Sequence, residues 1–179
     1  RQRQMCIRDS LDSLVGLFAI GQAPTGTKDP FAQRRAALGV CQNLIEWQQN
    51  LDLRWALAEA AQGLNMDVAE SDISACLEFI QGRLRGMLLD LNFNYDVIDA
   101  VLAEKGNDPY SAFVDVQSLS GWVAREVWGE ILPAFSRCVR ITRDQEEVYQ
   151  VNASKFETDS EKVLYNALLA AEKELEGLD

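Results

Sequence analysis

The chain has 179 residues and carries 28 acidic against 17 basic side chains, a formal net charge of −11. Apolar residues make up 47% of the sequence and charged residues 25%, a composition that is typical of a folded globular chain and excludes a disordered or fibrous one. The acidic balance argues against a generic nucleic-acid coat protein or a polybasic membrane binder, and the absence of histidine excludes Ser-His-Asp catalysis, Cys-His catalysis and histidine-ligated metal centres within this stretch.

Residues 1–10 differ from the sequence that follows them. They contain three arginines and one acid, and they lack a helical apolar period. The run from Met5 to Ser10 resembles a translated sequencing-library adapter, so we expect residues 1–10 to be a non-native segment and the chain to start inside a larger gene. A basic N-terminal arm is the alternative interpretation.

Helical periodicity predicts a series of helices from Leu11 onward, so the expected fold class is all-α. Residues 21–28 are rich in turn formers and predict a loop, after which Asp29 has the character of an N-cap with Pro30 at the first helical position. A long helix from Asp108 is expected to kink or break at Pro133. The other predicted helix starts are Asp52, Ser71, Asn94 and Asp159 or Ser160, the predicted ends are Gln49–Asn50, Gly63 and Gly106, and residues 148–158 are expected to be irregular.

The four cysteines lie far apart and form no CxxC pair, so zinc-ribbon spacing is absent. Cys41 and Cys76 have apolar helical neighbours, which predicts buried free thiols and fits a reducing, cytosolic compartment. No apolar run is long enough for a transmembrane helix. The sequence also lacks a phosphate-binding loop, a GxGxxG motif and metal-spaced carboxylates, so we expect no catalytic residue and no metal site in this chain.

Three clusters of basic residues stand out against the acidic background. Arginine side chains suit phosphate groups, and a helical stripe of them can follow a nucleic-acid backbone, whereas surface pairing with the abundant acids is the alternative. Near the third cluster, Trp122, Trp128 and Phe135 can stack on bases, but their helical spacing favours burial in the core. The clusters are Lys28, Arg34 and Arg35; Arg83 and Arg85, which point about 200° apart; and Arg137, Arg140 and Arg143, which form one slanted stripe.

Three consecutive segments carry a family-specific pattern: residues 11–22 (LDSLVGLFAIGQ), 24–32 (PTGTKDPFA) and 34–40 (RRAALGV). They resemble one known family, the β subunit of the bacterial two-subunit glycyl-tRNA synthetase. Weaker resemblance continues through 82–85 (GRLR), 97–102 (VIDAVL) and 151–154 (VNAS). The resemblance covers most of residues 11–179 and implies a fragment from the C-terminal region of a subunit several times longer.

The resemblance also implies a division of the chain. Residues 11–66 would be the end of a helical HD-like body, and residues 67–131 would be connecting helices. Residues 132–179 would be an incomplete helical anticodon-binding domain, similar to that of arginyl-tRNA synthetase.

In this family the α subunit carries the class II active site for glycine and ATP, and the β subunit binds tRNA-Gly and completes an α2β2 enzyme. The resemblance therefore implies tRNA-Gly and the α subunit as partners, a cytoplasmic location, no cofactor in this chain because ATP binds the α subunit, and neither DNA nor a membrane as partner. The family often has Lys-Arg-Val-x-Asn-Ile at residues 136–141. Arg137 and Ile141 match that pattern, Ser136 lacks the base, and Arg140 adds one.

With this resemblance, the stripe of Arg137, Arg140 and Arg143 becomes the preferred RNA contact. The residues from Lys28 to Arg35 serve either RNA binding or the fold. A non-enzymatic helical protein-interaction module is the second hypothesis, with an apolar docking surface around Leu84, Leu88 and Leu91, unless these leucines form the core.

Overall fold

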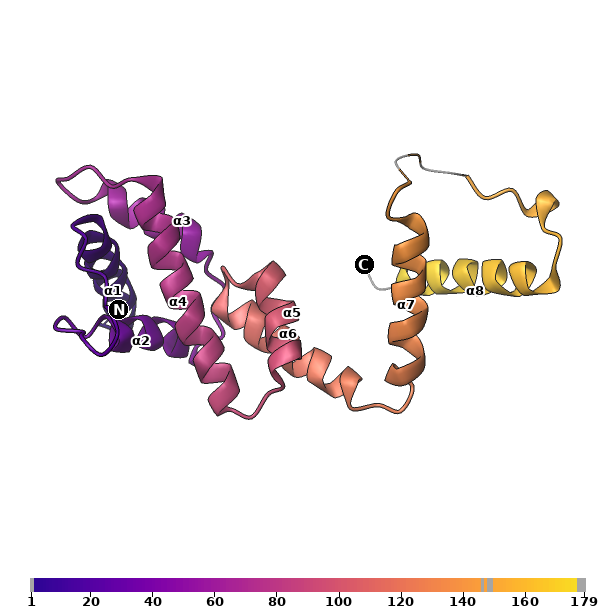
Figure 1. Ribbon diagram of the computed structural model, residues 1–179, viewed down its shortest axis with the longest axis horizontal. Coiled ribbons are helices and arrows are strands. Elements are labelled where there is room, and N and C mark those ends of the chain that lie inside the picture. Colours follow the sequence, from indigo (N-terminus) through magenta and orange to yellow (C-terminus); the bar gives the residue numbers. More distant parts are fainter. Residues whose placement is uncertain (1, 146, 148–149, 177–179) are drawn as a thin grey trace. The chain divides into compact units, whose positions relative to one another are not determined.

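The computed structural model describes residues 2–145, 147 and 150–176, without the side chains of residues 2–6 (Figure 1). The described residues form helices and no β-strand, which confirms the all-α fold class. The chain divides into two compact units, residues 1–129 and 130–179, so the predicted division at 66/67 falls inside unit 1. The helices are α1 (Gln2–Ala19), α2 (Gln33–Glu46), α3 (Leu53–Gln62), α4 (Glu70–Asp90), α5 (Tyr95–Lys105), α6 (Pro109–Val123), α7 (Trp128–Thr142), the 3₁₀ helix η1 (Ala153–Lys155) and α8 (Asp159–Leu175).

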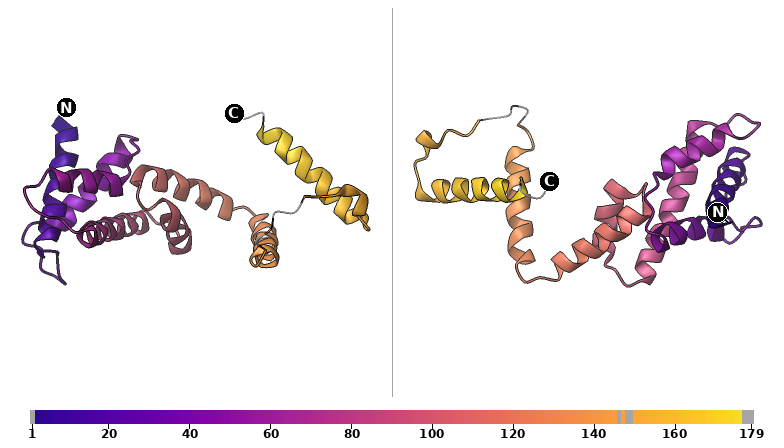
Figure 2. Two further views of the ribbon diagram at one scale, coloured as in Figure 1. Left: turned by 90° about the horizontal axis from the view of Figure 1, so that it is seen from above. Right: turned by 180° about the vertical axis from the view of Figure 1, so that it is seen from behind.

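Helix α4 is the centre of unit 1. It packs against α1, α2, α3 and α5, while α6 packs on α5 and α2 (Figures 1 and 2). Its inward face carries an apolar residue every three or four positions, and these side chains are buried. Leu84 and Leu88 are fully buried in this core, whereas Leu91 is 52% exposed. The docking surface that the protein-interaction hypothesis placed on these leucines is therefore core over most of its length.

The burial of two cysteines is confirmed. Cys41 on α2 and Cys76 on α4 are both fully buried and free. Burial raises the pKa of each thiol to about 12, because an apolar surrounding disfavours the thiolate. Cys138 is exposed on α7.

Several helix ends lie where their capping residues predict them. The Asp52 carboxylate accepts hydrogen bonds from the backbone N–H groups of Arg54 and Trp55, at 2.8 and 3.1 Å. Asp108 accepts one from the N–H of Ser111 at 3.1 Å, with Pro109 as the first residue of α6. These caps satisfy N–H groups that have no partner inside the helix, and the required residue is adjacent in sequence, which is why the sequence locates them.

The start of α2 differs from the prediction. The helix begins at Gln33, and Pro30 lies in the preceding turn rather than at the first helical position. The Asp29 carboxylate still caps the helix, because it reaches across the turn and accepts hydrogen bonds from the N–H groups of Gln33 and Arg34, at 2.8 and 3.0 Å. Ala32 closes the turn in the left-handed region, with φ of 54°.

Helix α1 begins at Gln2, so the described part of the expected non-native segment is helical although it lacks an apolar period, and Arg1 lies outside the described residues. The side chain of Ile7 is half-buried against the core of unit 1. Burial of Ile7, one turn before Leu11, extends the apolar face of the helix into a segment where the sequence shows too few apolar residues to reveal the period.

The break expected at Pro133 lies earlier in the chain. Helix α6 ends at Val123, residues 124–127 form turns, and Pro133 lies inside α7 as its sixth residue. Because Pro133 has no backbone N–H, it cannot donate the hydrogen bond to the carbonyl of Gly129. Only one turn of helix precedes Pro133, so the helix tolerates this loss. The predicted break is therefore not at Pro133 but at residues 124–127, before α7 begins.

Unit 2 consists of most of α7, η1 and α8, and none of the side chains described in it is buried. The Thr158 hydroxyl and the Glu161 carboxylate form a capping box at the start of α8, which confirms the predicted start. The ring of Phe156, after η1, packs edge-on against Tyr165 at 5.5 Å between centroids. Val148 and Tyr149 of the predicted irregular segment lie outside the described residues.

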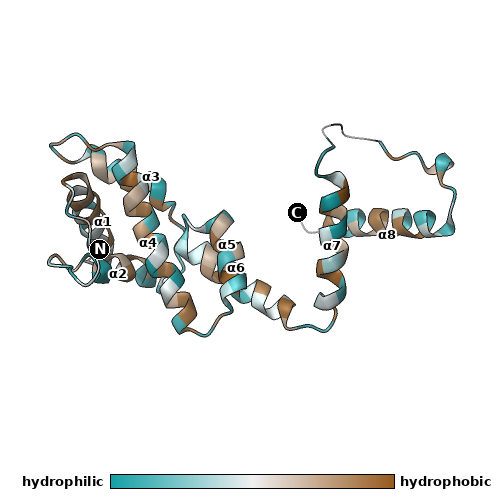
Figure 3. Cartoon of the chain, in the orientation of Figure 1, coloured by the Kyte–Doolittle hydropathy of each residue, from teal (hydrophilic) through white to brown (hydrophobic). Residues whose placement is uncertain are grey.

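Helices α7 and α8 both expose apolar side chains. Figure 3 colours the hydrophobic residues of both helices brown. Nowhere in the chain as described is a helix both long and apolar enough to cross a membrane.

Candidate cationic binding sites

The first predicted cluster separates into one structural arginine and two exposed cations. The Arg34 guanidinium donates a hydrogen bond to the carbonyl of Gly26 at 2.6 Å and lies 3.9 Å from the Asp29 carboxylate. It therefore holds the loop that precedes α2. Lys28 and Arg35 are exposed, and neither makes an ion pair with any residue that the structure describes.

Gln33 is a buried polar residue that holds this loop, a role that no sequence pattern indicates. It is 1% exposed, and its side-chain amide donates a 2.7 Å hydrogen bond to the carbonyl of Gln22. Its Oε1 atom has no hydrogen-bond partner in the described part of the chain. The contact ties the start of the loop to the first turn of α2, eleven residues later.

The Asp29 carboxylate is stabilised in its charged form. The N–H groups of Arg34 and Gln33 donate to it, and the guanidinium groups of Arg34 and Arg35 lie nearby, so its pKa is held below the ordinary value. The negative charge of Asp29 is compensated by the N–H groups at the start of α2 and by Arg34. The loop that precedes α2 therefore keeps a positive character. Between Ser13 and Ile45 the sequence contains no other acid.

The second predicted cluster does not present two equivalent arginines. The Arg85 guanidinium makes two hydrogen bonds to the Asp99 carboxylate of α5, at 2.6 and 2.9 Å. These bonds raise the pKa of Arg85 and lower that of Asp99. Arg83 is exposed, and its guanidinium lies over the ring of Phe79 at 5.7 Å from the centroid.

The third predicted cluster is the least compensated by acids. Arg137 and Arg140 lie on α7 and Arg143 in the turn after it, and all three are exposed. Among the described residues no carboxylate pairs with them, and the sequence from Ile131 to Arg143 contains no acid. The helix period places the stripe beside the apolar face of α7, which lies on the side of Phe135 and Val139.

The aromatic residues near this stripe do not follow the prediction of core burial. Phe135 is 64% exposed and Trp122 is 45% exposed, and Trp128 is half-buried. The Arg125 guanidinium lies 4.0 Å from the centre of the Trp122 ring, a cation–π contact between α6 and the turn that follows it. Helical spacing marks an apolar face, but it does not say whether a second element covers that face.

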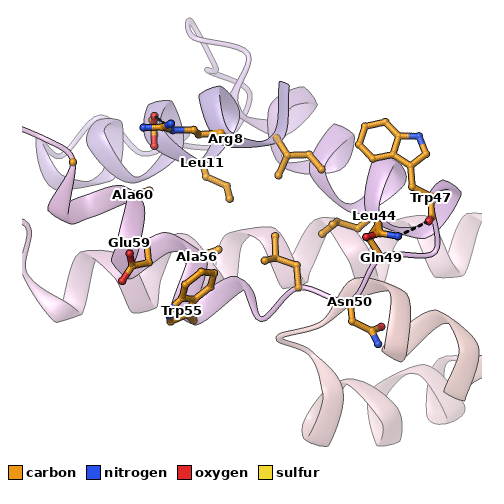
Figure 4. A pocket seen from close by; sticks show the side chains of 14 residues that line it. Arg8, Leu11, Leu44, Trp47, Gln49, Asn50, Trp55, Ala56, Glu59 and Ala60 are labelled. Atoms are coloured by element: carbon orange, nitrogen blue, oxygen red, sulfur yellow. Dashed lines mark hydrogen bonds and ion pairs between the residues drawn. The ribbon is translucent and has the colours of Figure 1, made fainter. Parts of the chain in front are cut away.

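Unit 1 also contains a large cavity that the sequence analysis did not identify. It measures about 940 Å³ and lies between the first half of α1, the turn after α2 and the exposed side of α3 (Figure 4). Trp47 and Trp55 lie at its rim, and the Arg8–Asp12 ion pair of 3.8 Å borders it. Its floor is apolar, formed by Leu11, Leu44 and Ala56 among others. The lining holds no cluster of nucleophile and base.

The described residues contain no group of three or more histidine, cysteine, aspartate or glutamate side chains placed to hold a metal ion. The chemistry that these sites support is the binding of anionic groups by guanidinium and ammonium side chains.

Comparison with known proteins identifies the family. The family model described as "Glycyl-tRNA synthetase beta subunit" matches residues 3–103. Similar curated proteins include the glycine–tRNA ligase beta subunits of Clostridioides difficile (33% identity over 90% of this chain and 24% of the relative) and Desulforamulus reducens (35%, 97% and 26%). A chloroplastic/mitochondrial glycine–tRNA ligase of Arabidopsis thaliana is 34% identical over 90% of this chain and 15% of the relative.

These relatives are glycine–tRNA ligases, which belong to the aminoacyl-tRNA synthetases, and the chain is similar to them in sequence. More narrowly, the chain belongs to the glycyl-tRNA synthetase beta subunit family. It spans about a quarter of the length of the bacterial relatives named above.

Proposed function

We propose that this chain is a tRNA-binding part of a glycine–tRNA ligase beta subunit and contributes no catalytic group. The observation that carries the proposal is the segment from Ile131 to Arg143, where three exposed arginines occur without an acid. In the proposed enzyme an α subunit joins glycine to tRNA-Gly at the expense of ATP. The chain takes part as the β component of an α2β2 assembly.

The mechanism is electrostatic recognition of a folded RNA. Phosphates lie on the outside of an RNA helix, and an arginine presents a planar set of donors to each of them. The net charge of −11 does not oppose this, because screening limits each charge to about 8–10 Å at physiological salt and the local potential decides contact. Binding releases counterions and therefore weakens as the salt concentration rises.

Filter binding of tRNA-Gly tests the proposal with a charge-matched pair of triple variants. R137A/R140A/R143A removes the stripe, and K155A/K162A/K173A removes the same charge from the other cations of unit 2. We expect the arginine variant to bind at least tenfold more weakly and to lower the slope of log Kd against log salt concentration by about 3, one for each phosphate contact. The lysine variant should differ little from the parent chain.

Equal affinities and equal salt slopes for the parent and the arginine variant would remove the stripe from the interface. The catalytic part of the proposal has its own test. The chain alone should not attach radiolabelled glycine to tRNA-Gly in the presence of ATP, and measurable glycylation without an α subunit would contradict it. The cytoplasmic location stays a prediction.

The exposed apolar face of α7 favours a second candidate function, docking of a protein partner. Leu132, Phe135 and Val139 are 47, 64 and 39% exposed and follow one another at helical spacing. A buried interface would remove this surface from water. If F135S abolishes co-sedimentation with the α subunit and leaves tRNA affinity unchanged, the face serves assembly rather than RNA binding.

A further inference from the structure

The loop before α2 is held in one shape by contacts that come from both of its sides. Gln33 donates to the carbonyl of Gln22, Arg34 donates to the carbonyl of Gly26, and Asp29 accepts from the first N–H groups of α2. Inside the loop, Thr25 and Lys28 exchange two backbone hydrogen bonds of 3.2 and 2.8 Å. A loop with this many internal contacts places its exposed side chains in fixed positions.

Among the side chains that this loop and the first turn of α2 expose are a cation, an aromatic ring and a second cation. Lys28 ends the paired part of the loop, Phe31 is 53% exposed in the turn, and Arg35 lies in the first turn of α2. The side-chain hydrogen bonds that hold the loop come from Gln33, Arg34 and Asp29. The fold therefore does not explain why Lys28, Phe31 and Arg35 are exposed. The left-handed backbone of Ala32, unusual for a residue with a side chain, directs the chain from Phe31 into the helix.

We propose that Lys28, Phe31 and Arg35 form a platform for an unpaired stretch of RNA, with a base stacked on the Phe31 ring and the flanking phosphates held by the two cations. The inference rests on the proposed function and adds a second RNA contact, on unit 1. Every base has a face that stacks on an aromatic ring, so the platform tolerates different bases. A duplex buries its base faces and offers the Phe31 ring nothing to stack on.

The positive charge of Lys28 and Arg35 favours RNA over an acidic protein surface only together with the Phe31 ring. The cations account for affinity to any polyanion, whereas a half-exposed phenylalanine that lies between them in the sequence fits a ligand that carries both charge and an exposed aromatic face. Asp29 does not repel such a ligand strongly, because Arg34 and the N–H groups of α2 already compensate its charge.

Fluorescence anisotropy on the 179-residue chain tests the platform with two probes of one sequence, a labelled single-stranded 8-nucleotide RNA and its duplex. We expect F31A to weaken binding of the single strand about tenfold and to leave the duplex unchanged. F31W should restore single-strand affinity, because indole also stacks. K28A and R35A should each lower the salt slope by about 0.7, the value for one phosphate of a single strand.

The controls separate this inference from the proposed function. Phe31 is on the surface, and unchanged urea unfolding of F31A shows that the variant keeps its fold. Equal single-strand affinity for F31A and the parent chain would overturn the platform, and so would an equal loss on the duplex. If tRNA-Gly binding still depends on the α7 stripe in that case, the proposed function stands alone. If the parent chain binds neither probe, the platform is wrong, and the filter-binding experiment with tRNA-Gly decides the proposed function separately.

Discussion

Replacing Leu84 by alanine tests whether α4 is the centre of unit 1. The side chain is fully buried in a helix that packs against four others. Its loss removes three carbon atoms from the core and leaves a cavity, because walls formed by separate helices collapse only partly. Measured losses for buried leucines span about 2.7–5 kcal/mol, and we expect about 3–4 kcal/mol here.

The matched control is L91A on the same helix. Leu91 is 52% exposed, so about half of its apolar surface is already in water, and we expect a loss below about 1 kcal/mol. Urea unfolding followed by tryptophan fluorescence reports on unit 1, since all four tryptophans lie at or before Trp128. The reasoning is refuted if L84A loses less than about 1 kcal/mol or if both variants lose the same free energy.

Three further outcomes are expected. In the native chain iodoacetamide should label Cys138, while Cys41 and Cys76 should react only after unfolding, as peptide mass spectrometry can show, because burial raises the pKa of both thiols to about 12. Amide hydrogens of α8 should exchange faster than those of α4, since unit 2 has no buried side chain among its described residues; equal protection would contradict this. The hydrogen bonds from Arg85 lower the pKa of Asp99 below 3.8. The stability that the pair contributes is therefore present above pH 3.8 and is lost as the pH falls through the folded-state pKa. D99N should abolish that part of the acid dependence in urea unfolding.

Features set by neighbouring residues could be predicted from the sequence. Asp52 and Asp108 cap helices through bonds to residues two or three positions ahead, and Thr158 with Glu161 closes a box of four residues. Such local contacts need no knowledge of the tertiary fold. The same locality explains why the end of α3 at Gly63 could be predicted.

Features set by residues far apart in sequence could not be predicted. Asp99 lies fourteen residues after Arg85, and only the packing of α5 on α4 brings the two charges together. The buried position of Gln33 depends on a loop carbonyl eleven residues earlier. Exposure of Phe135 was missed for a related reason, since helical spacing identifies an apolar face without identifying what covers it.

The three basic clusters therefore differ in how many existing contacts their arginines must break to bind a phosphate. Arg85 would have to break two charge-assisted hydrogen bonds and leave Asp99 without its partner, so its replacement should change stability more than RNA affinity. Arg34 would have to release the loop carbonyl of Gly26. Arg137 exchanges only water for a phosphate oxygen, as far as the described residues go. A guanidinium group that already has its carboxylate is structural, and one that lacks it in an acidic chain is the better candidate for binding.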